Sequence, residues 1–379
     1  MELVIYDRIR NRKVEFFNEF VLHLKFNSIS SNFQLDYYYN PNVTETKEMS
    51  CIGHYHICYL YHNGVILLTG YIISIKFHSK KVKQLVSISG YSLPGFLNDC
   101  NIATNQSVDT AIDEVGNLKW KTAIPRPYGY SLENSGLSLR QIAEKILAPF
   151  KLGIVIDPVV SSLMDEVFEE TTAKPTESIA NYLTDLAAQK NIVITHNQFG
   201  NVVFTRVSTR LVPILDFNVQ NSETIPGVEF DLGFNGQVMH SQITVFKEKD
   251  GDEENAAENT VSNPFVPFVF RPRTIIQNSG TDVDTLLAAR NARANELRAV
   301  GLGISLDRWE DKNGDVIKPG NTVSIINPEI YIFKKTEFFI EEVELRGNQK
   351  SFTSKLHCVP KSVYDGSEPT YIWAGINLH

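Results

Sequence analysis

The sequence predicts a β-rich α+β fold with two similar small β-barrels, an intervening α+β domain and a helical insert in the second barrel. Three observations predict this fold. Short segments of alternating apolar and polar residues fill the first hundred positions, amphipathic helical stretches follow, and β-like segments return after residue 207. The chain has 379 residues, of which 42% are hydrophobic and 21% charged, so it is long enough to bury more than one core.

The first barrel is expected over residues 1–100. Asn63-Gly64 supplies the positive φ angles that a tight hairpin turn requires, and it stands between two β-like segments. Five or more short strands with turn signals between them are typical of a small barrel or sandwich. The expected strands cover residues 20–26, 33–37, 56–61, 65–75 and 82–89.

A long loop or insertion is expected at residues 101–136, which are rich in Asn, Thr, Gly and Pro. A small α+β domain is then predicted over 137–206. Its first helix is capped by Ser138 and Gln141, and its second opens at residues 174–177. The strands expected in this domain cover residues 153–156, 167–168, 192–195 and 202–205.

The second barrel is predicted from two stretches of chain, residues 207–247 and 300–362, because β character returns in both. In the first stretch the β-like segments are Arg210–Phe217 and Gln242–Phe246, and the second stretch contains turns at Lys312–Asp315 and Lys318–Asn321.

The helical insert in this barrel is expected at residues 248–299, and residues 363–379 form a C-terminal tail. The insert begins with an acidic loop that is too polar to offset the cost of its own ordering, so it should be exposed and open to cleavage. A helix follows from Asp282 to about Ala299, after a Thr281 cap.

Composition argues against several classes of protein. The net charge of −8 does not favour nucleic-acid binding, because that affinity comes from clustered Lys and Arg. The most apolar stretch, Val65–Ile75, is interrupted by polar residues and is too short to span a membrane. The start of the chain does not resemble a secretion signal, so folding in the cytoplasm of the producing cell is expected. Packed, reduced thiols are expected rather than disulfides or a zinc site at Cys51, Cys58, Cys100 and Cys358.

Candidate chemical sites in the sequence are weak. His54, His56 and Cys58 have the spacing of one strand face, which suits metal ligands but is more often a polar strand face. Asp311–Asp315 begins like a calcium loop, yet Thr322 stands where the closing glutamate belongs, which favours a plain hairpin turn.

The other tests for chemistry give no candidates. The acidic run Asp250–Glu254 is interpreted as a solvated loop. No nucleophile elbow, phosphate loop, zinc-protease or dinucleotide motif is present in the sequence. No catalytic, cofactor-binding or metal-binding residue is therefore predicted, and no cofactor.

The predicted order of domains resembles the baseplate hub family of Mu-type contractile phages. In the α+β domain, Leu137–Phe150 followed by Gly153–Ile156 is similar to a hydrophobic helix, a proline, an aromatic residue and a strand in that family. Further similar segments are Pro175–Leu183, Asn191–Thr195, Gly200–Arg206, Arg271-Pro272, Ala289–Arg293, Lys318–Gly320 and Phe338–Val343. The similarity covers most of the chain except residues 101–136 and the acidic loop, and no residue-level repeat between the two β regions is visible.

The resemblance implies a mechanical role rather than catalysis. Three copies, each with two similar barrels, would form a pseudo-sixfold ring that joins a sixfold tail tube to a threefold central spike in the baseplate of a virion tail. It implies a homotrimer that contacts a tail tube or distal tail protein, a spike protein and baseplate wedge proteins, without membrane insertion or direct nucleic-acid binding. The rival hypotheses are a receptor- or glycan-binding tail-tip protein, for which Tyr37–Tyr39 offers slight support, and a cell-wall hydrolase.

Overall fold

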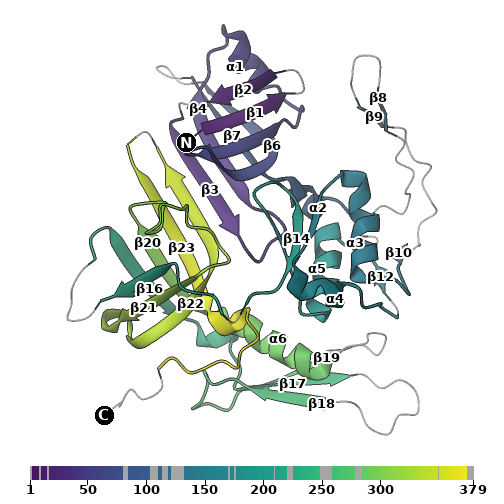
Figure 1. Cartoon of the computed structure of the whole chain (residues 1–379), viewed down its shortest axis with the longest axis vertical. Coiled ribbons are helices and arrows are strands. Elements are labelled where there is room, and N and C mark those ends of the chain that lie inside the picture. Colours follow the sequence, from purple (N-terminus) through teal and green to yellow (C-terminus); the bar gives the residue numbers. More distant parts are fainter. Residues whose placement is uncertain are drawn as a thin grey trace.

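The computed structural model describes most of the chain and shows a large β-sheet beside two smaller units (Figure 1). Within the described residues, no helix is long and apolar enough to cross a membrane. The described residues are 2–7, 10–14, 17–79, 84–102, 110–112, 118–120, 132–169, 171–174, 176–208, 210–219, 225–247, 258–277, 284–348 and 350–373.

The N-terminal region contributes seven strands to the large sheet, in the order β3-β4-β7-β6-β5-β1-β2. Residues Asn63 and Gly64 both have positive φ in the hairpin between β5 and β6, so the predicted turn is confirmed. The short helix α1 (Thr44–Met49) was not predicted. The strands are β1 (Glu2–Asp7), β2 (Arg10–Val14), β3 (Glu19–Lys25), β4 (Asn32–Tyr38), β5 (Ile57–His62), β6 (Val65–Ser79) and β7 (Gln84–Ser92).

The C-terminal region contributes the other six strands, in the order β16-β20-β23-β22, with β21 paired to β22 and β15 paired to β21. Strand β16 was not predicted, although its residues alternate between apolar and polar. The strands are β15 (Leu215–Asn218), β16 (Val228–Phe234), β20 (Val300–Leu306), β21 (Thr322–Asn327), β22 (Ile332–Gly347) and β23 (Phe352–Pro360).

The two β regions are joined, which differs from the prediction of two separate barrels. Strand β22 pairs with β3, so all thirteen strands form one sheet. Among the described residues neither region closes on itself: in the first region the second edge of β3 is already paired with β22, and in the second region β16 pairs with β20 alone. The β-rich α+β class is confirmed, whereas the two β regions are open and continuous with each other.

The middle domain packs two helices against a three-stranded sheet of order β11-β14-β13. Ser138 and Gln141 form the predicted capping box at the start of α3. The second helix, α5, begins at Ile179 with Ser178 as its cap, later than predicted, because Ser178 accepts the free backbone N–H of Asn181. The elements are α2 (Phe96–Asp99), α3 (Leu139–Leu147), β11 (Ile154–Ile156), α4 (Ser161–Met164), α5 (Ile179–Gln189), β13 (Val193–His196) and β14 (Val202–Thr205).

The segment predicted as a long loop at 101–136 lies largely outside the described residues. Its described parts are the paired strands β8 (Thr110–Ile112) and β9 (Leu118–Trp120), and β10 (Leu132–Glu133), which pairs with β12 (Thr172–Ala173). The strand predicted around Val167-Phe168 is only a single bridge between Ser138 and Val167.

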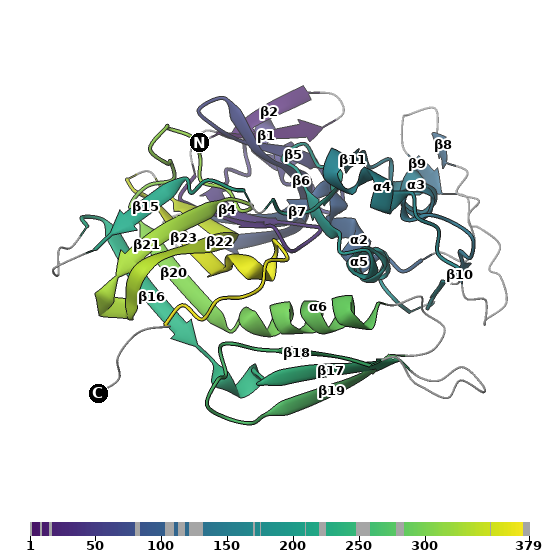
Figure 2. The same ribbon diagram turned by 60° about the horizontal axis from the view of Figure 1, so that its bottom comes forward.

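The insert between β16 and β20 is larger than predicted, since β17 belongs to it rather than to the second β region. Strands β17 (Gln242–Lys247), β18 (Glu258–Ser262) and β19 (Pro272–Gln277) form their own sheet, and α6 (Thr285–Leu297) covers it (Figure 2). Asp284 caps α6 by accepting two backbone N–H groups. The predicted Thr281 cap, the Asp282 helix start and the acidic run Asp250–Glu254 lie outside the described residues.

Candidate assembly interface

The two β regions contain the same five-strand unit. The first β unit is β3-β4-β7-β6-β5 and the second β unit is β16-β20-β23-β22-β21. In both units the strands follow the same order along the chain and every pairing is antiparallel. The structure therefore contains an internal duplication of a β region. The alternation of apolar and polar residues in the sequence does not reveal this duplication.

The pairing register repeats as well. In the first unit β6 and β7 shift register between Ile72 and Ser74, and in the second unit β22 and β23 shift between Ile340 and Glu342. The bulged residue is thus Ile73 in one unit and its counterpart Glu341 in the other. From these bulges the equivalence extends through β7 and β4 to β3, where Glu19-Phe20-Val21-Leu22 corresponds to Glu229-Phe230-Asp231-Leu232 in β16.

The units meet where the second half of β22 pairs with β3 over six register positions. On the core face, Leu22 and Leu345 lie opposite each other and both are fully buried. On the solvent face, Lys25 Nζ lies 3.1 Å from Glu342 Oε1, and His23 Nδ1 lies 3.4 Å from Glu344 Oε2. A buried apolar row and a row of opposite charges therefore fix both the register and the orientation of this junction.

Trp309 closes the core side of the junction. Its side chain is fully buried, and its Nε1 donates to the carbonyl oxygens of Arg346 and Thr353, each at 2.9 Å. It contacts the rings of Phe20 and His62, both from the first unit. Because Trp309 lies in the connection between β20 and β21 of the second unit and contacts the first unit, it helps to hold the two units together.

An ionic cluster centred on the buried side chain of Glu341 surrounds the bulge of the second unit. Arg298 Nε donates to Glu341 Oε1 at 2.8 Å, and the Tyr364 hydroxyl donates to the same oxygen. Burial raises the pKa of the Glu341 carboxyl, but hydrogen bonds from His357 and Tyr364 and the charge of Arg298 outweigh it, so its pKa lies at about 2. The hydrogen bond to Glu341 raises the pKa of His357. The cluster connects the end of α6 and the C-terminal segment to β22.

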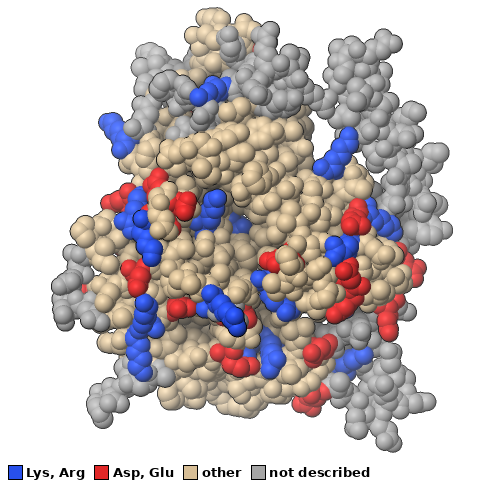
Figure 3. Space-filling view, viewed as in Figure 1, with Lys and Arg blue, Asp and Glu red and all other residues tan. Residues whose placement is uncertain are grey.

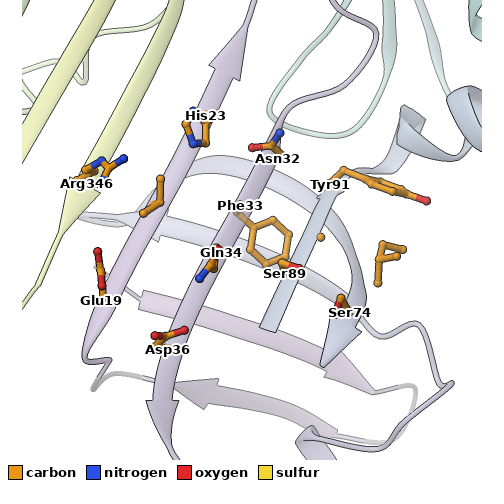
Figure 4. A pocket seen from close by; sticks show the side chains of 13 residues that line it. Glu19, His23, Asn32, Phe33, Gln34, Asp36, Ser74, Ser89, Tyr91 and Arg346 are labelled. Atoms are coloured by element: carbon orange, nitrogen blue, oxygen red, sulfur yellow. The ribbon is translucent and has the colours of Figure 1, made fainter. Parts of the chain in front are cut away.

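The solvent face of the first unit forms an open groove of about 560 Å³ across β3, β4, β6 and β7, lined by both polar and apolar residues (Figure 4). Glu19 and Asp36 lie opposite each other on β3 and β4 at one end of this groove, and His23 and Asn32 lie opposite each other at the other end. Arg346 reaches the groove from β22 of the second unit. This face is polar in both units, with charged residues of both signs on β22 and β23.

His54, His56 and Cys58 do not share the one strand face that their spacing predicted. The strand begins at Ile57, so His54 and His56 lie in the preceding loop, where Tyr55 has positive φ, and Cys58 is buried in the core. Among the described residues, no group of three or more His, Cys, Asp or Glu side chains is placed to hold a metal ion. All four cysteines are free thiols.

The Asp311 segment forms a hairpin turn, as the sequence favoured. The Asp311 carboxylate accepts the backbone N–H groups of Asn313 and Asp315, and Gly314 has a φ of +84°. On the face shown in Figure 3, acidic and basic side chains are interspersed rather than gathered in a patch of one sign. Sequence reasoning missed the junction, because a pairing between β3 and β22 joins residues that are far apart in the chain.

Comparison with known proteins agrees with this fold. Residues 129–206 match the family model "Baseplate hub protein gp44-like, second domain". No curated protein matches the chain. The 43 kDa tail protein of prophage MuSo2 from Shewanella oneidensis superposes with a TM-score of 0.73 at 16% identity, over 96% of this chain and 100% of that one.

Two further solved structures have the same fold. A tail protein from Neisseria meningitidis MC58 gives a TM-score of 0.72 at 16% identity, over 96% of this chain and 97% of that one. The E. coli c3393 protein, a type VI secretion component described as similar to phage T4 tail proteins gp27 and gp5, gives 0.53 at 10% identity, over 98% and 80%.

Residues 129–206 therefore form a domain of the baseplate hub gp44-like kind, and the chain as a whole shares the fold of the two phage-type tail proteins above. The resemblance to baseplate hubs inferred from the sequence is confirmed for this domain by the family model, and the likeness to the prophage MuSo2 tail protein extends it over the chain as a likeness of fold.

Proposed function

We propose that this chain is the structural hub subunit of a phage or phage-like tail baseplate, in which three copies form a ring of six β units. The observation that carries the proposal is the repeated β unit, whose strand order and bulge register recur within one chain. A trimer of such chains contains three identical chains but six β units with the same strand order.

This arrangement would join a sixfold tail tube to a threefold central spike. The six β units present a nearly sixfold surface to the tube. The parts that the units do not share would carry the threefold character and contact the spike and the baseplate wedge proteins. Those parts are the middle domain, the 101–136 segment and the insert with α6. The polar solvent face of the sheet would line the central channel. The complex would be assembled in the host cytoplasm and remain in the virion tail.

The mass of the assembly in solution tests the proposal. A trimer of a 42.8 kDa chain has a mass of about 128 kDa, and micrographs of it should show threefold symmetry with six similar densities in the ring. A chain that stays monomeric at all concentrations, or a ring of six identical chains, would overturn the proposal.

We also propose that the chain has no hydrolase activity and needs no cofactor. Glu19 and Asp36 are the carboxylates to test, because they face each other in the groove as a pair of catalytic acids would. Purified chain should release no fragments from peptidoglycan. Reproducible turnover that disappears in Glu19→Gln or Asp36→Asn, while those variants remain folded, would make the protein an enzyme instead.

A further inference from the structure

Several strand edges of the large sheet are unpaired within the described chain: those of β2 and β15, which each pair with one strand only, and those of β16 and the second half of β6. Strand β16 stands at the end of the sheet and pairs with β20 alone. Strand β6 pairs with β5 through its first half and with β7 through its second, so one side of residues 74–79 faces no strand of the described chain. Such edges carry backbone N–H and C=O groups that are ready to pair with another strand.

The open edges of β16 and of residues 74–79 in β6 are the counterparts of the two edges that meet inside the chain. By the alignment of the bulges, the second half of β6 corresponds to the second half of β22, and β16 corresponds to β3. Within the chain, β22 pairs with β3, whereas the equivalent edges of β6 and β16 do not pair with each other.

The core-facing side chains differ in exposure between the two combinations. At the internal junction Leu345 and Leu22 are 0% exposed, whereas their counterpart Phe77 is 42% exposed and Leu232 is only partly buried. Phe234 packs against Trp373 yet remains 49% exposed, while its counterpart Leu24 is 6% exposed. Apolar residues that are buried at the internal junction therefore have counterparts at the open edges that are more exposed to solvent.

On the solvent face, the open edges carry opposite charges, as the paired edges do, but the signs on equivalent strands are reversed. At the internal junction β3 is basic, through His23 and Lys25, and β22 is acidic at the opposing positions. On the open edges β6 carries Lys76 and His78, and β16 carries Glu229 and Asp231. Opposite charges across neighbouring strands stabilise pairing, and like charges oppose it.

We infer that residues 74–79 of β6 pair with β16 of a second copy of this chain, in the antiparallel register that β22 forms with β3. In this register Phe77 lies opposite Leu232 on the core face, and His78 lies opposite Asp231 on the solvent face. Three such intermolecular junctions would alternate with three internal ones and close the ring. The inference rests on the proposed trimer and assigns its subunit contact.

Cysteine cross-linking tests the register directly. The pair His78→Cys with Asp231→Cys should form a disulfide between chains, which appears as covalent dimers and trimers on a denaturing gel and disappears on reduction. Mixing the two single variants should give dimers only. Because Cys58 and Cys358 are buried and Cys51 and Cys100 are partly exposed, a parent with Cys51→Ser and Cys100→Ser lowers the background.

The internal junction supplies a matched control. Arg346 and Val21 occupy the corresponding opposed positions, so Arg346→Cys with Val21→Cys should form the same bond within one chain. If this control does not oxidise, a short bifunctional maleimide replaces oxidation for both pairs. A pair that is one residue out of register, His78→Cys with Leu232→Cys, should not cross-link, because its side chains lie on opposite faces of the sheet.

A charge reversal gives an independent readout. Asp231→Lys should shift the trimer toward monomer by like-charge repulsion with Lys76, and adding His78→Glu to the same chain should restore the trimer through a new Glu–Lys pair. A trimer that gives no cross-link at this pair would overturn the inferred junction and leave the proposed ring. A monomer would overturn both, and cross-linked ladders longer than three chains would overturn the trimer but keep the junction.

Discussion

The two β units keep the same backbone pairing but differ in what surrounds the bulge of their long strand. In the second unit the bulged residue is Glu341, held by Arg298, Tyr364 and His357. In the first unit it is Ile73, which borders the open groove. The second unit also carries the insert between β16 and β20, where the first unit has only residues 26–31.

This difference shows that register can persist where side-chain chemistry has diverged. A bulge fixes the pairing on both sides of it whether the extra residue is apolar or charged, because the shift belongs to the backbone. The charged residue Glu341 has a further role, since its contacts connect the insert and the C-terminal segment to β22. The strand pairing that both units share and this ionic cluster, called the anchor below, can therefore be tested separately.

The largest effect is expected from the anchor. Arg298→Met would remove the arginine that pairs with the buried Glu341 carboxylate and leave it with His357 and Tyr364, which should lower the free energy of unfolding by about 3 kcal/mol. Urea unfolding of the variant and the parent measures the difference. The matched change in the first unit, Ile73→Val, should cost less than about 1 kcal/mol.

Two further variants sharpen this result. Arg298→Lys keeps the charge and should be clearly more stable than Arg298→Met. The double variant Arg298→Met with Glu341→Leu should recover much of the lost stability, because no buried charge remains. An Arg298→Met protein as stable as its parent would mean that the cluster does not anchor the second unit.

A smaller difference between the units is expected from leucines at equivalent positions in β3 and β16. Leu22→Ala removes a fully buried side chain and should cost about 3 kcal/mol, whereas Leu232→Ala at an open edge should cost about 1 kcal/mol in the monomer. Unfolding at concentrations that favour assembly should bring the two values together, because Leu232 is then covered. Equal costs in the dilute monomer would contradict the assignment of Leu22 to an occupied edge and of Leu232 to an open edge.

The elements that the sequence predicted correctly are those determined by residues close to each other in the chain. The Asn63-Gly64 hairpin and the Ser138 capping box depend on residues within a few positions of each other, and both are present. The start of α5 was misplaced because Thr176 and Ser178 are both capping residues, and only Ser178 caps it in the structure.

The features that sequence reasoning missed depend on which strands are partners. The alternation in β17 predicts a half-buried strand but does not say which sheet it joins, and it pairs with β18 and β19. The junction between β3 and β22 and the repeated bulge are likewise defined by distant pairings. Ile73 and Glu341 share a backbone role and no chemistry, so their equivalence is visible only in three dimensions.

Acid should weaken the second unit more than the first. The pKa of Glu341 is about 2 in the folded chain, below its ordinary value of 4.5, so its contribution is complete above pH 4.5 and is lost as the pH falls toward 2. The loss should amount to roughly 2 to 3 kcal/mol. Unfolding followed from pH 7 to pH 2 measures it, and Glu341→Gln should have a flatter pH dependence. An unchanged slope in that variant would assign the acid sensitivity to other carboxylates.

The smallest effect is expected in the insert, which the two units do not share. Residues 248–257 connect β17, which ends at Lys247, to β18, which begins at Glu258, and Phe246 already pairs with Glu258. Because the strand ends are adjacent, replacing 248–257 by a short Asn-Gly turn should change the free energy of unfolding by less than about 0.5 kcal/mol. Protease should cut the parent first within this segment. Val245→Asp, which places a charge in the buried face of the same sheet, is the contrasting variant and should destabilise the insert strongly, as should burying any unpaired charge. A shortened chain that unfolds as readily as Val245→Asp would show that these acidic residues contribute to the fold.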